Sequence, residues 1–303
     1  MDKIIRKNYE HAGRIHQSAV KRAKKIVKAD VLLLNIATEL ESFIQSELKE
    51  HNLKGGLAFP VNLSVNFQAA HATPKINDET LLHESDLLKI DMGVQVDGFI
   101  ADGAFSINFS NDHAKQIETN EAVLETALSV IKVGHSVSEI GNAVEPLVEK
   151  AGFKVISNLT GHGLGQFTQH APPSIPNTRN HSSVKIGDPM AFAVEPFVST
   201  GRGSVADSAQ VEIFSVEELR PVRDLSARKI LEFAHEVFSG LPFAERQLSK
   251  IGLSDFARKV GLRELVKAGI LHSYPVLVEQ KDAFVSQCEK TVIIDDQEVI
   301  VIN

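Results

Sequence analysis

Two lone aspartates, Asp91 and Asp102, interrupt the otherwise apolar stretch KIDMGVQVDGFIADGAF. A buried carboxylate is costly unless it is hydrogen-bonded, paired with a charge or bound to a cation. Eleven positions separate the two residues, so one continuous strand would direct them to opposite faces. The Asp97-Gly98 dipeptide favours a tight hairpin turn, which would bring both carboxylates to one point of a sheet. From these residues alone, capping by backbone N–H groups at the strand edges is an equal explanation.

Further acidic and histidine side chains stand in comparable positions. In TGHGLGQFTQH, glycines surround His162 where the backbone must approach another group closely, and His170 follows eight residues later. Glu195 and Glu289 each interrupt an apolar strand-like run, and His71 occurs in NFQAAHATP. Singly, each is equally consistent with a structural role. Together, two Asp, two Glu and one His are the ligands that a pair of divalent cations needs, and the cations would compensate the buried carboxylates.

The segments that must position these residues repeat one order along the chain. Helical periodicity predicts four helices, at about 3–28, 32–49, 113–132 and 136–151. Each pair precedes strand-like segments, so the order helix–helix–strands occurs twice, over 3–109 and 112–215. Residues 218–272 are predicted to be helical with no intervening strand, and the strand-like segments AFVSQCEKTVIID and QEVIVIN follow. We expect one catalytic domain over residues 1–303, with 218–272 as a helical insertion in it.

Composition is that of a soluble globular protein, with 43% hydrophobic and 23% charged residues. The net charge of −7 argues against a dedicated nucleic-acid binder. The basic segment KRAKKIVK is interpreted as the solvated face of a helix, with a weak docking patch for RNA or a ribosome as the alternative. Cys288 is the only cysteine, which excludes an intramolecular disulfide and thiolate-rich zinc sites. Without a recognisable signal peptide or membrane span, we expect a cytoplasmic protein, and a monomer.

The combination of motifs resembles the methionine aminopeptidase family, specifically its type-2 branch as found in archaea, over essentially the whole chain. The segments that carry the resemblance are GGLAFPVNLSVN, AAHATP, KIDMGVQVDGFIAD, GHGLGQ, FAVEPFVSTGRG, LPFAERQL, YPVL and QCEKT. The resemblance implies the α+β pita-bread fold, in which a pseudo-two-fold axis relates two halves of an antiparallel sheet flanked by helices. The block at 218–272 corresponds to the type-2 insertion.

The activity implied by the resemblance is metal-assisted hydrolysis that removes the initiator methionine from nascent proteins and peptides, favouring small second residues. Two divalent cations, Co, Mn, Fe or Zn, would be held by Asp91, Asp102, His162, Glu195 and Glu289. Glu195 would also shuttle protons. The residues implied to contact the substrate are His71 and His170 as acid–base and oxyanion groups, and Phe59, Phe197 and Tyr274 as walls of the methionine pocket. For these three aromatic residues, ordinary core packing is an equal explanation.

Several positions depart from the family pattern. Gly103 stands where Thr is usual, Lys290 where His commonly follows the last glutamate, Cys288 where an aromatic is found, and Ala72 in place of a frequent Tyr. A hydroxyl missing beside a ligand can weaken metal binding about 10–100-fold. These departures put metal affinity and turnover in doubt, and leave the reaction class intact.

Two other functions are compatible with the same fold. Aminopeptidase P and prolidase share the five ligands but usually carry an extra N-terminal domain, whereas only about 55 residues precede the first predicted strand here. Non-catalytic relatives that bind nucleic acid or histones are expected to lose ligands, and all five are present. We therefore expect N-terminal Met peptides and nascent chains as partners, with a transient ribosome contact and neither a membrane nor a specific nucleic acid.

Overall fold

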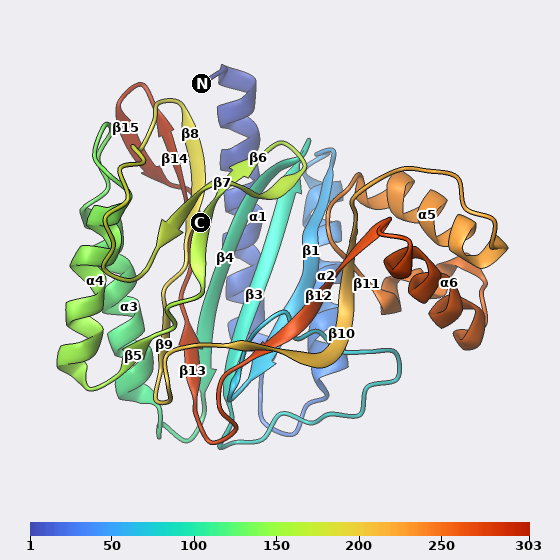
Figure 1. Ribbon diagram of the computed structural model, residues 1–303, viewed down its shortest axis with the longest axis horizontal. Coiled ribbons are helices and arrows are strands. Elements are labelled where there is room, and N and C mark those ends of the chain that lie inside the picture. The colour runs from blue at the N-terminus through green and yellow to red at the C-terminus, as the bar shows by residue number, and fades with distance from the viewer.

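Helices flank a curved set of antiparallel strands in the computed structural model, which describes residues 1–303 (Figure 1). The first half of the chain contains α1 (Lys3–Ile26), α2 (Leu33–Glu50), β1 (Gly55–Val65), β2 (Gln68–Ala70), β3 (Leu87–Val96) and β4 (Phe99–Asn108). The second half contains α3 (Ala114–Ser129), α4 (Ser138–Ala151), β5 (Lys154–Val155), β6 (Thr160–Gly165), β7 (Thr168–Pro176), β8 (Met190–Val194), β9 (Phe197–Ser199) and β10 (Ala206–Val216). The order helix–helix–strands therefore occurs twice, as the sequence predicts.

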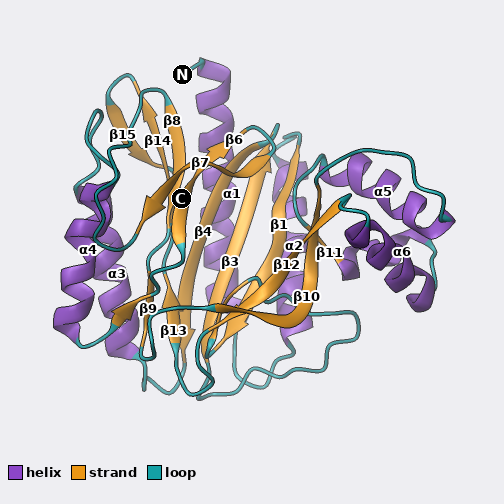
Figure 2. Cartoon of the chain, viewed as in Figure 1, coloured by secondary structure: helices purple, strands orange, loops and turns teal.

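The remaining elements form an extension beside the sheet and then return to it (Figure 2). They are α5 (Leu225–Phe238), β11 (Phe243–Ala244), the 3₁₀ helix η1 (Glu245–Ile251), α6 (Asp255–Lys267), β12 (Leu271–Val278), β13 (Val285–Gln287), β14 (Lys290–Asp295) and β15 (Glu298–Val301). Hydrogen bonds join the strands in the orders β1-β3-β4, β11-β10-β12-β2, β13-β9-β5 and β15-β14-β8-β6-β7. None of the helices has the length and apolar character that a membrane span requires.

Amphipathic helices cover the strands and leave the other face free for polar side chains. Helix α1 begins after Asp2, whose carboxylate accepts a hydrogen bond from the N–H of Ile4 at 2.7 Å. Its buried residues include Tyr9, Ala12 and Ile15, which recur at helical spacing. They join α2 and the strands β1, β3 and β4 in the largest apolar core. A second core packs α3 and α4 against strands of the second half.

The hairpin predicted at Asp97-Gly98 is confirmed. Both residues have positive φ, 48° and 84°, and Val96 pairs with Phe99 directly across the turn. In this register Asp91 lies opposite Ala104, and Asp102 lies opposite Gly93. Residues directly opposite in a ladder share a face, as do residues two apart on one strand. Asp91 and Asp102 therefore project from the same face of the sheet.

The two halves of the chain meet where β4 passes the segment between β13 and β14. Ala104 and Glu289 exchange backbone hydrogen bonds of 3.4 and 2.9 Å across this junction. The hydroxyl of Ser106 donates to the carbonyl of Gln287 and accepts from its N–H, both at 2.9 Å. These bonds place Glu289 beside the strand that carries Asp102.

The Gly-rich segment around His162 forms the hairpin β6–β7. Two expectations from the sequence differ from the structure. The strand-like segment AFVSQCEKTVIID is divided into β13 and β14 at Cys288 and Glu289. The helical block at 218–272 was expected to contain no strand, which is wrong. Strand β11 lies inside the block and pairs with β10, which precedes it. A two-residue strand is too short to produce an alternating pattern in the sequence.

A buried ion pair anchors the 218–272 block to the first half of the chain. Arg246 of η1 pairs with Glu41 of α2, and also donates to the hydroxyl of Thr73 at 2.6 Å and to the carbonyl of Pro74 at 3.2 Å. The side chain of Arg246 is only 8% exposed and that of Glu41 14%. A charge in such a place depends on its partner, because water cannot replace the lost interaction.

We expect Arg246→Ala to lower the free energy of unfolding by about 3 kcal/mol, because Glu41 would remain buried without a counter-charge. The control is Arg179→Ala, whose partner Glu149 and own side chain are about half exposed, at 54% and 51%. This change should cost less than about 1 kcal/mol. Urea denaturation of both variants measures the difference, and equal losses would contradict the anchoring role of Arg246.

Candidate active site

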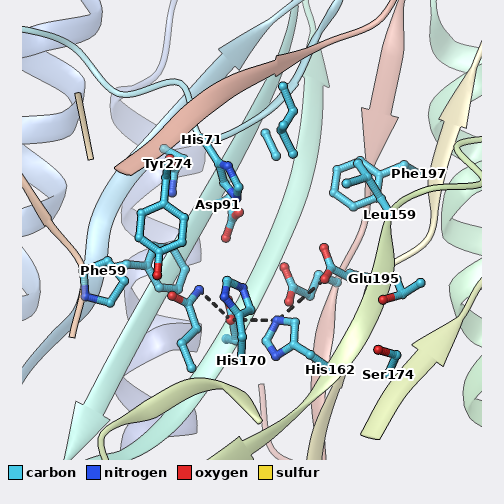
Figure 3. Close-up of a pocket in the computed structure, with 18 of the residues that line it drawn as sticks. Phe59, His71, Asp91, Leu159, His162, His170, Ser174, Glu195, Phe197 and Tyr274 are labelled. Carbon is cyan, nitrogen blue, oxygen red and sulfur yellow. Dashed lines mark hydrogen bonds and ion pairs between the residues drawn. The ribbon is translucent and has the colours of Figure 1, made fainter. Parts of the chain in front are cut away.

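One cavity of about 500 Å³ is lined by all five residues that the sequence singled out as candidate metal ligands. Figure 3 labels three of them, Asp91, His162 and Glu195. They arrive from separate parts of the fold: Asp91 from β3, Asp102 from β4, His162 from β6, Glu195 between β8 and β9, and Glu289 between β13 and β14. The structure therefore brings together residues that are up to 198 positions apart in the chain, from 91 to 289.

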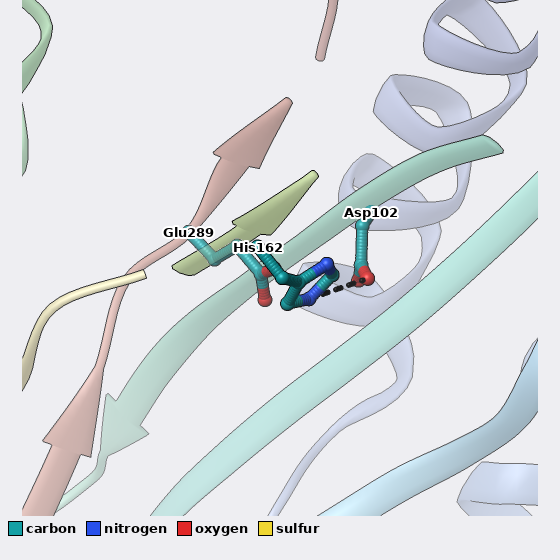
Figure 4. Close-up of side chains that lie close together, drawn as sticks. All are labelled: Asp102, His162 and Glu289. Atoms are coloured by element: carbon teal, nitrogen blue, oxygen red, sulfur yellow. Dashed lines mark ion pairs between the residues drawn. The ribbon is translucent and has the colours of Figure 1, made fainter. Parts of the chain in front are cut away.

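The imidazole of His162 lies between carboxylates of both halves. Its Nε2 is 3.8 Å from Oδ2 of Asp102 and 3.6 Å from Oε1 of Glu195. Asp102, His162 and Glu289 each offer a ligand-type atom, and these atoms all lie within 4.8 Å of one another (Figure 4). Asp91 joins the group through Gln287, whose Nε2 is 3.5 Å from Oδ2 of Asp91 and 3.3 Å from Oε2 of Glu289.

The carboxylates lack the partners that usually make burial tolerable. No Lys or Arg side chain forms an ion pair with Asp91, Asp102, Glu195 or Glu289, and Oδ1 of each aspartate is buried without a hydrogen bond. Burial raises the pKa of Asp91 to about 7. Burial and the neighbouring carboxylates raise the pKa values of the other three well above their usual range.

This donor set fits divalent cations. Orphaned carboxylate oxygens and one imidazole are the hard ligands that such ions take, and a cation would remove the cost of burying like charges together. Burial lowers the pKa of His162 to about 4, which keeps the ring in the neutral form that a metal requires. The assignment of all five residues as metal ligands remains a prediction.

Hydrogen bonds from side chains of β14 and the C-terminal residue hold the backbone of Asp102 in place. The Thr291 hydroxyl accepts from its N–H and donates to its carbonyl, both at 2.8 Å, and Nδ2 of Asn303 donates to the same carbonyl at 2.6 Å. A Cβ at Gly103 would lie 2.4 Å from Nδ2 of Asn303 and 2.7 Å from Cε1 of His16. The space that a threonine side chain would need at this position is therefore already filled.

The residues expected to contact substrate all border the same cavity: Phe59, His71, His170, Phe197 and Tyr274. Figure 3 shows Phe59 and Tyr274 on one side of the drawn carboxylates and Phe197 with Leu159 on the other. The ring of His170 stands 4.5 Å from that of His162 and nearly perpendicular to it. Burial and the nearby His162, His71 and His272 lower the pKa of His170 to about 3, so this ring is neutral.

Sequence reasoning missed three amides in the cavity or beside the ligands. Asn62 lies opposite Asp91 in the β1–β3 ladder, and Gln169 donates to Oδ2 of Asp102 at 3.3 Å. Gln287 bridges Asp91 and Glu289. Its position two residues before Glu289 was a usable signal, because such residues share a face of an extended strand. No comparable signal marks Asn62 or Gln169.

Fold and site together define a metallopeptidase-type centre, and comparisons with known proteins agree. The model of metallopeptidase family M24 matches residues 7–216. A methionine aminopeptidase of Archaeoglobus fulgidus is 40% identical over 296 residues, 98% of this chain and 97% of that protein. A methionine aminopeptidase of Pyrococcus abyssi is 39% identical over 302 residues, 99% of this chain and 98% of that protein. The chain belongs to metallopeptidase family M24, and within it to the methionine aminopeptidases.

Solved structures show the same fold. A thermophilic Arx1 superposes with a TM-score of 0.88 at 18% identity, over 100% of this chain and 91% of that one. A methionine aminopeptidase of Rickettsia prowazekii superposes with a TM-score of 0.70 at 18% identity, over 100% and 98%. The α+β pita-bread fold expected from the sequence is thereby confirmed, and members of this family use divalent metals.

We expect Asp102→Asn to weaken Mn²⁺ binding to metal-stripped protein by more than the factor of about 10–100 typical of losing an outer hydrogen bond, because a charged ligand becomes neutral. The matched control is Asp97→Asn in the turn of the same hairpin, where Asn-Gly is equally favourable. Calorimetric titration measures both affinities. Wild-type affinity in Asp102→Asn would contradict the ligand role.

Proposed function

We propose that the protein removes the N-terminal methionine from peptides and nascent proteins by hydrolysing the first peptide bond. The observation that carries this proposal is the convergence of Asp91, Asp102, His162, Glu195 and Glu289 in one cavity with aromatic walls. The flexible thioether of methionine suits such an apolar slot, and a confined exit favours small second residues. Relatives of nearly the same length that are named methionine aminopeptidase support the same substrate.

Two divalent cations would be held by these five side chains, since four carboxylates neutralise two dications. When bound, such ions polarise carbonyl oxygens and lower the pKa of water. Mn, Co, Fe and Zn are all compatible with a carboxylate-rich site that contains one imidazole.

The chain's own residues supply proton transfer and orientation. Glu195 accepts a proton from the attacking water at a carboxylate oxygen and delivers it to the departing amine. His170, neutral because of burial, donates an N–H hydrogen bond to the carbonyl oxygen as it gains negative charge. Nδ1 of His71 lies 3.2 Å from the carbonyl of Pro275, so the proton is on that nitrogen and Nε2 accepts from the N–H of the second residue.

The organisation around the site is part of the same proposal. We treat residues 1–303 as one catalytic domain with 218–272 as its type-2 insertion, because β11 pairs with β10 and Pro242 borders the cavity. A monomer acting on nascent chains in the cytoplasm, with a transient ribosome contact, is the setting that this activity implies. Cleavage before proline, as in aminopeptidase P or prolidase, is the second candidate, because the same five ligands serve it.

We expect metal-stripped protein to release no methionine from Met-Ala-Ser, and protein reloaded with Mn²⁺ or Co²⁺ to release it, with Ala-Pro-Ala left intact. Amino-acid analysis of the products measures both reactions. Cleavage of Ala-Pro-Ala alone would favour the second candidate, whereas silence on both peptides with metal bound would contradict a peptidase.

We expect His170→Ala to lower kcat on Met-Ala-Ser by about 10²–10³-fold, the usual loss for an oxyanion hydrogen bond, with Mn²⁺ affinity unchanged. The control is His135→Ala, since this surface histidine pairs with Glu139 on the outside of the molecule. Steady-state kinetics and calorimetry separate the two effects. An unchanged kcat would remove His170 from the mechanism.

A further inference from the structure

Asn62 is a buried residue at the substrate cavity, and its side-chain amide oxygen has no hydrogen-bond partner. It borders the same cavity as the candidate ligands and is only 4% exposed. Its Nδ2 donates to the carbonyl of Pro60 at 3.2 Å, whereas its Oδ1 is buried and has no hydrogen-bond partner. A buried acceptor without a donor is unfavourable, so a donor that arrives with a ligand would bind more tightly there.

The position of Asn62 is fixed relative to Asp91. The two residues face each other in the antiparallel ladder of β1 and β3, which puts their Cβ atoms about 4.5–5.5 Å apart on one face. The register of β1 shifts between Phe59 and Asn62, so this part of the strand bulges. Asn62 thus sits between an aromatic wall of the cavity and a carboxylate.

The bulge is held from outside the cavity. The N–H of Val61 donates to Oε1 of Glu41 at 3.1 Å, and the hydroxyl of Thr73 donates to the carbonyl of Val61 at 2.7 Å. Both polar groups of the bulged residue are therefore satisfied without Asn62. The amide oxygen of Asn62 thus has no hydrogen-bond partner within the chain, and the residue that carries it borders the cavity.

The chemistry of an N-terminal methionine leaves one group that can satisfy this oxygen. A thioether and a carbonyl have no N–H or O–H donor. The N–H of the scissile bond belongs to the second residue, and the proposed function assigns it to Nε2 of His71. The α-amino group is the only donor of the first residue. We propose that Asn62 is a substrate-binding residue whose Oδ1 accepts a hydrogen bond from the free α-amino group. This inference rests on the proposed function and names a residue that recognises the free α-amino group of the substrate.

The test compares two ligands that differ only in the amino group: L-methionine and 4-(methylthio)butanoate. Calorimetry on the Mn²⁺-loaded wild-type protein gives the ratio of their Kd values, and we expect methionine to bind more tightly. Asn62→Leu, similar in size but without an acceptor, should reduce this ratio about tenfold, the effect of one hydrogen bond to an amino group. Asn62→Val is the second variant if the first does not fold.

The matched control is Asn120→Leu. Nδ2 of Asn120 also donates to a proline carbonyl, that of Pro196 at 2.9 Å, and its Oδ1 is also buried without a partner. Asn120 lies on α3 and does not border the cavity. Its replacement should leave the ratio of the two Kd values as in the wild type, whatever it does to stability.

Three results would overturn the inference: a wild-type protein that does not prefer methionine, a folded Asn62 variant that keeps the wild-type ratio, or an equal loss of the ratio in Asn120→Leu. The second of these results includes a weakening of both ligands by the same factor, in which case Asn62 would serve the side-chain pocket. Hydrolysis of Met-Ala-Ser is measured separately. If that fails while the ratio depends on Asn62, the proposed function is wrong and the amino-group contact stands.

Discussion

Four carboxylates gathered in one cavity without a Lys or Arg partner, Asp102 and Glu289 buried and Asp91 and Glu195 partly buried, are the constraint on which the rest of this structure depends. Like charges in a medium of low polarity repel each other strongly, and burial raises all four pKa values, with the neighbouring carboxylates adding to the effect at Asp102, Glu195 and Glu289. Such an arrangement lowers the stability of the folded chain unless cations bind. The scaffold must therefore hold these side chains in place by contacts that do not involve the carboxylates themselves.

The fold meets this requirement through backbone contacts between its two halves. The β3–β4 hairpin aligns both aspartates on one face, and the exchange of hydrogen bonds between Ala104 and Glu289 places a glutamate of the far end beside them. Thr291 and Asn303 fix the backbone of Asp102 from behind. Because helices pack on the other face of the strands, the polar face can carry the site without disturbing the main cores.

The sequence predicted the parts of this arrangement that leave a local signal. Asp97-Gly98 indicated the hairpin, and isolated acidic residues in apolar strands indicated the candidate ligands. Three features left no such signal. Strand β11 has only two residues, the bulge before Asn62 depends on Glu41 and Thr73 from other elements, and Asn303 contacts Asp102 across 201 positions. Those contacts are set by the packing of distant segments, which periodicity cannot reveal. The Thr absent at position 103 shows the same limit, because His16 and Asn303 fill its place.

The most direct test of the account is anomalous diffraction from crystals of the Mn²⁺-loaded protein. If cations compensate the buried carboxylates, two manganese peaks will lie in the cavity, among Asp91, Asp102, His162, Glu195 and Glu289. A cavity without a peak, in crystals of protein that still releases methionine from Met-Ala-Ser, would contradict the central claim.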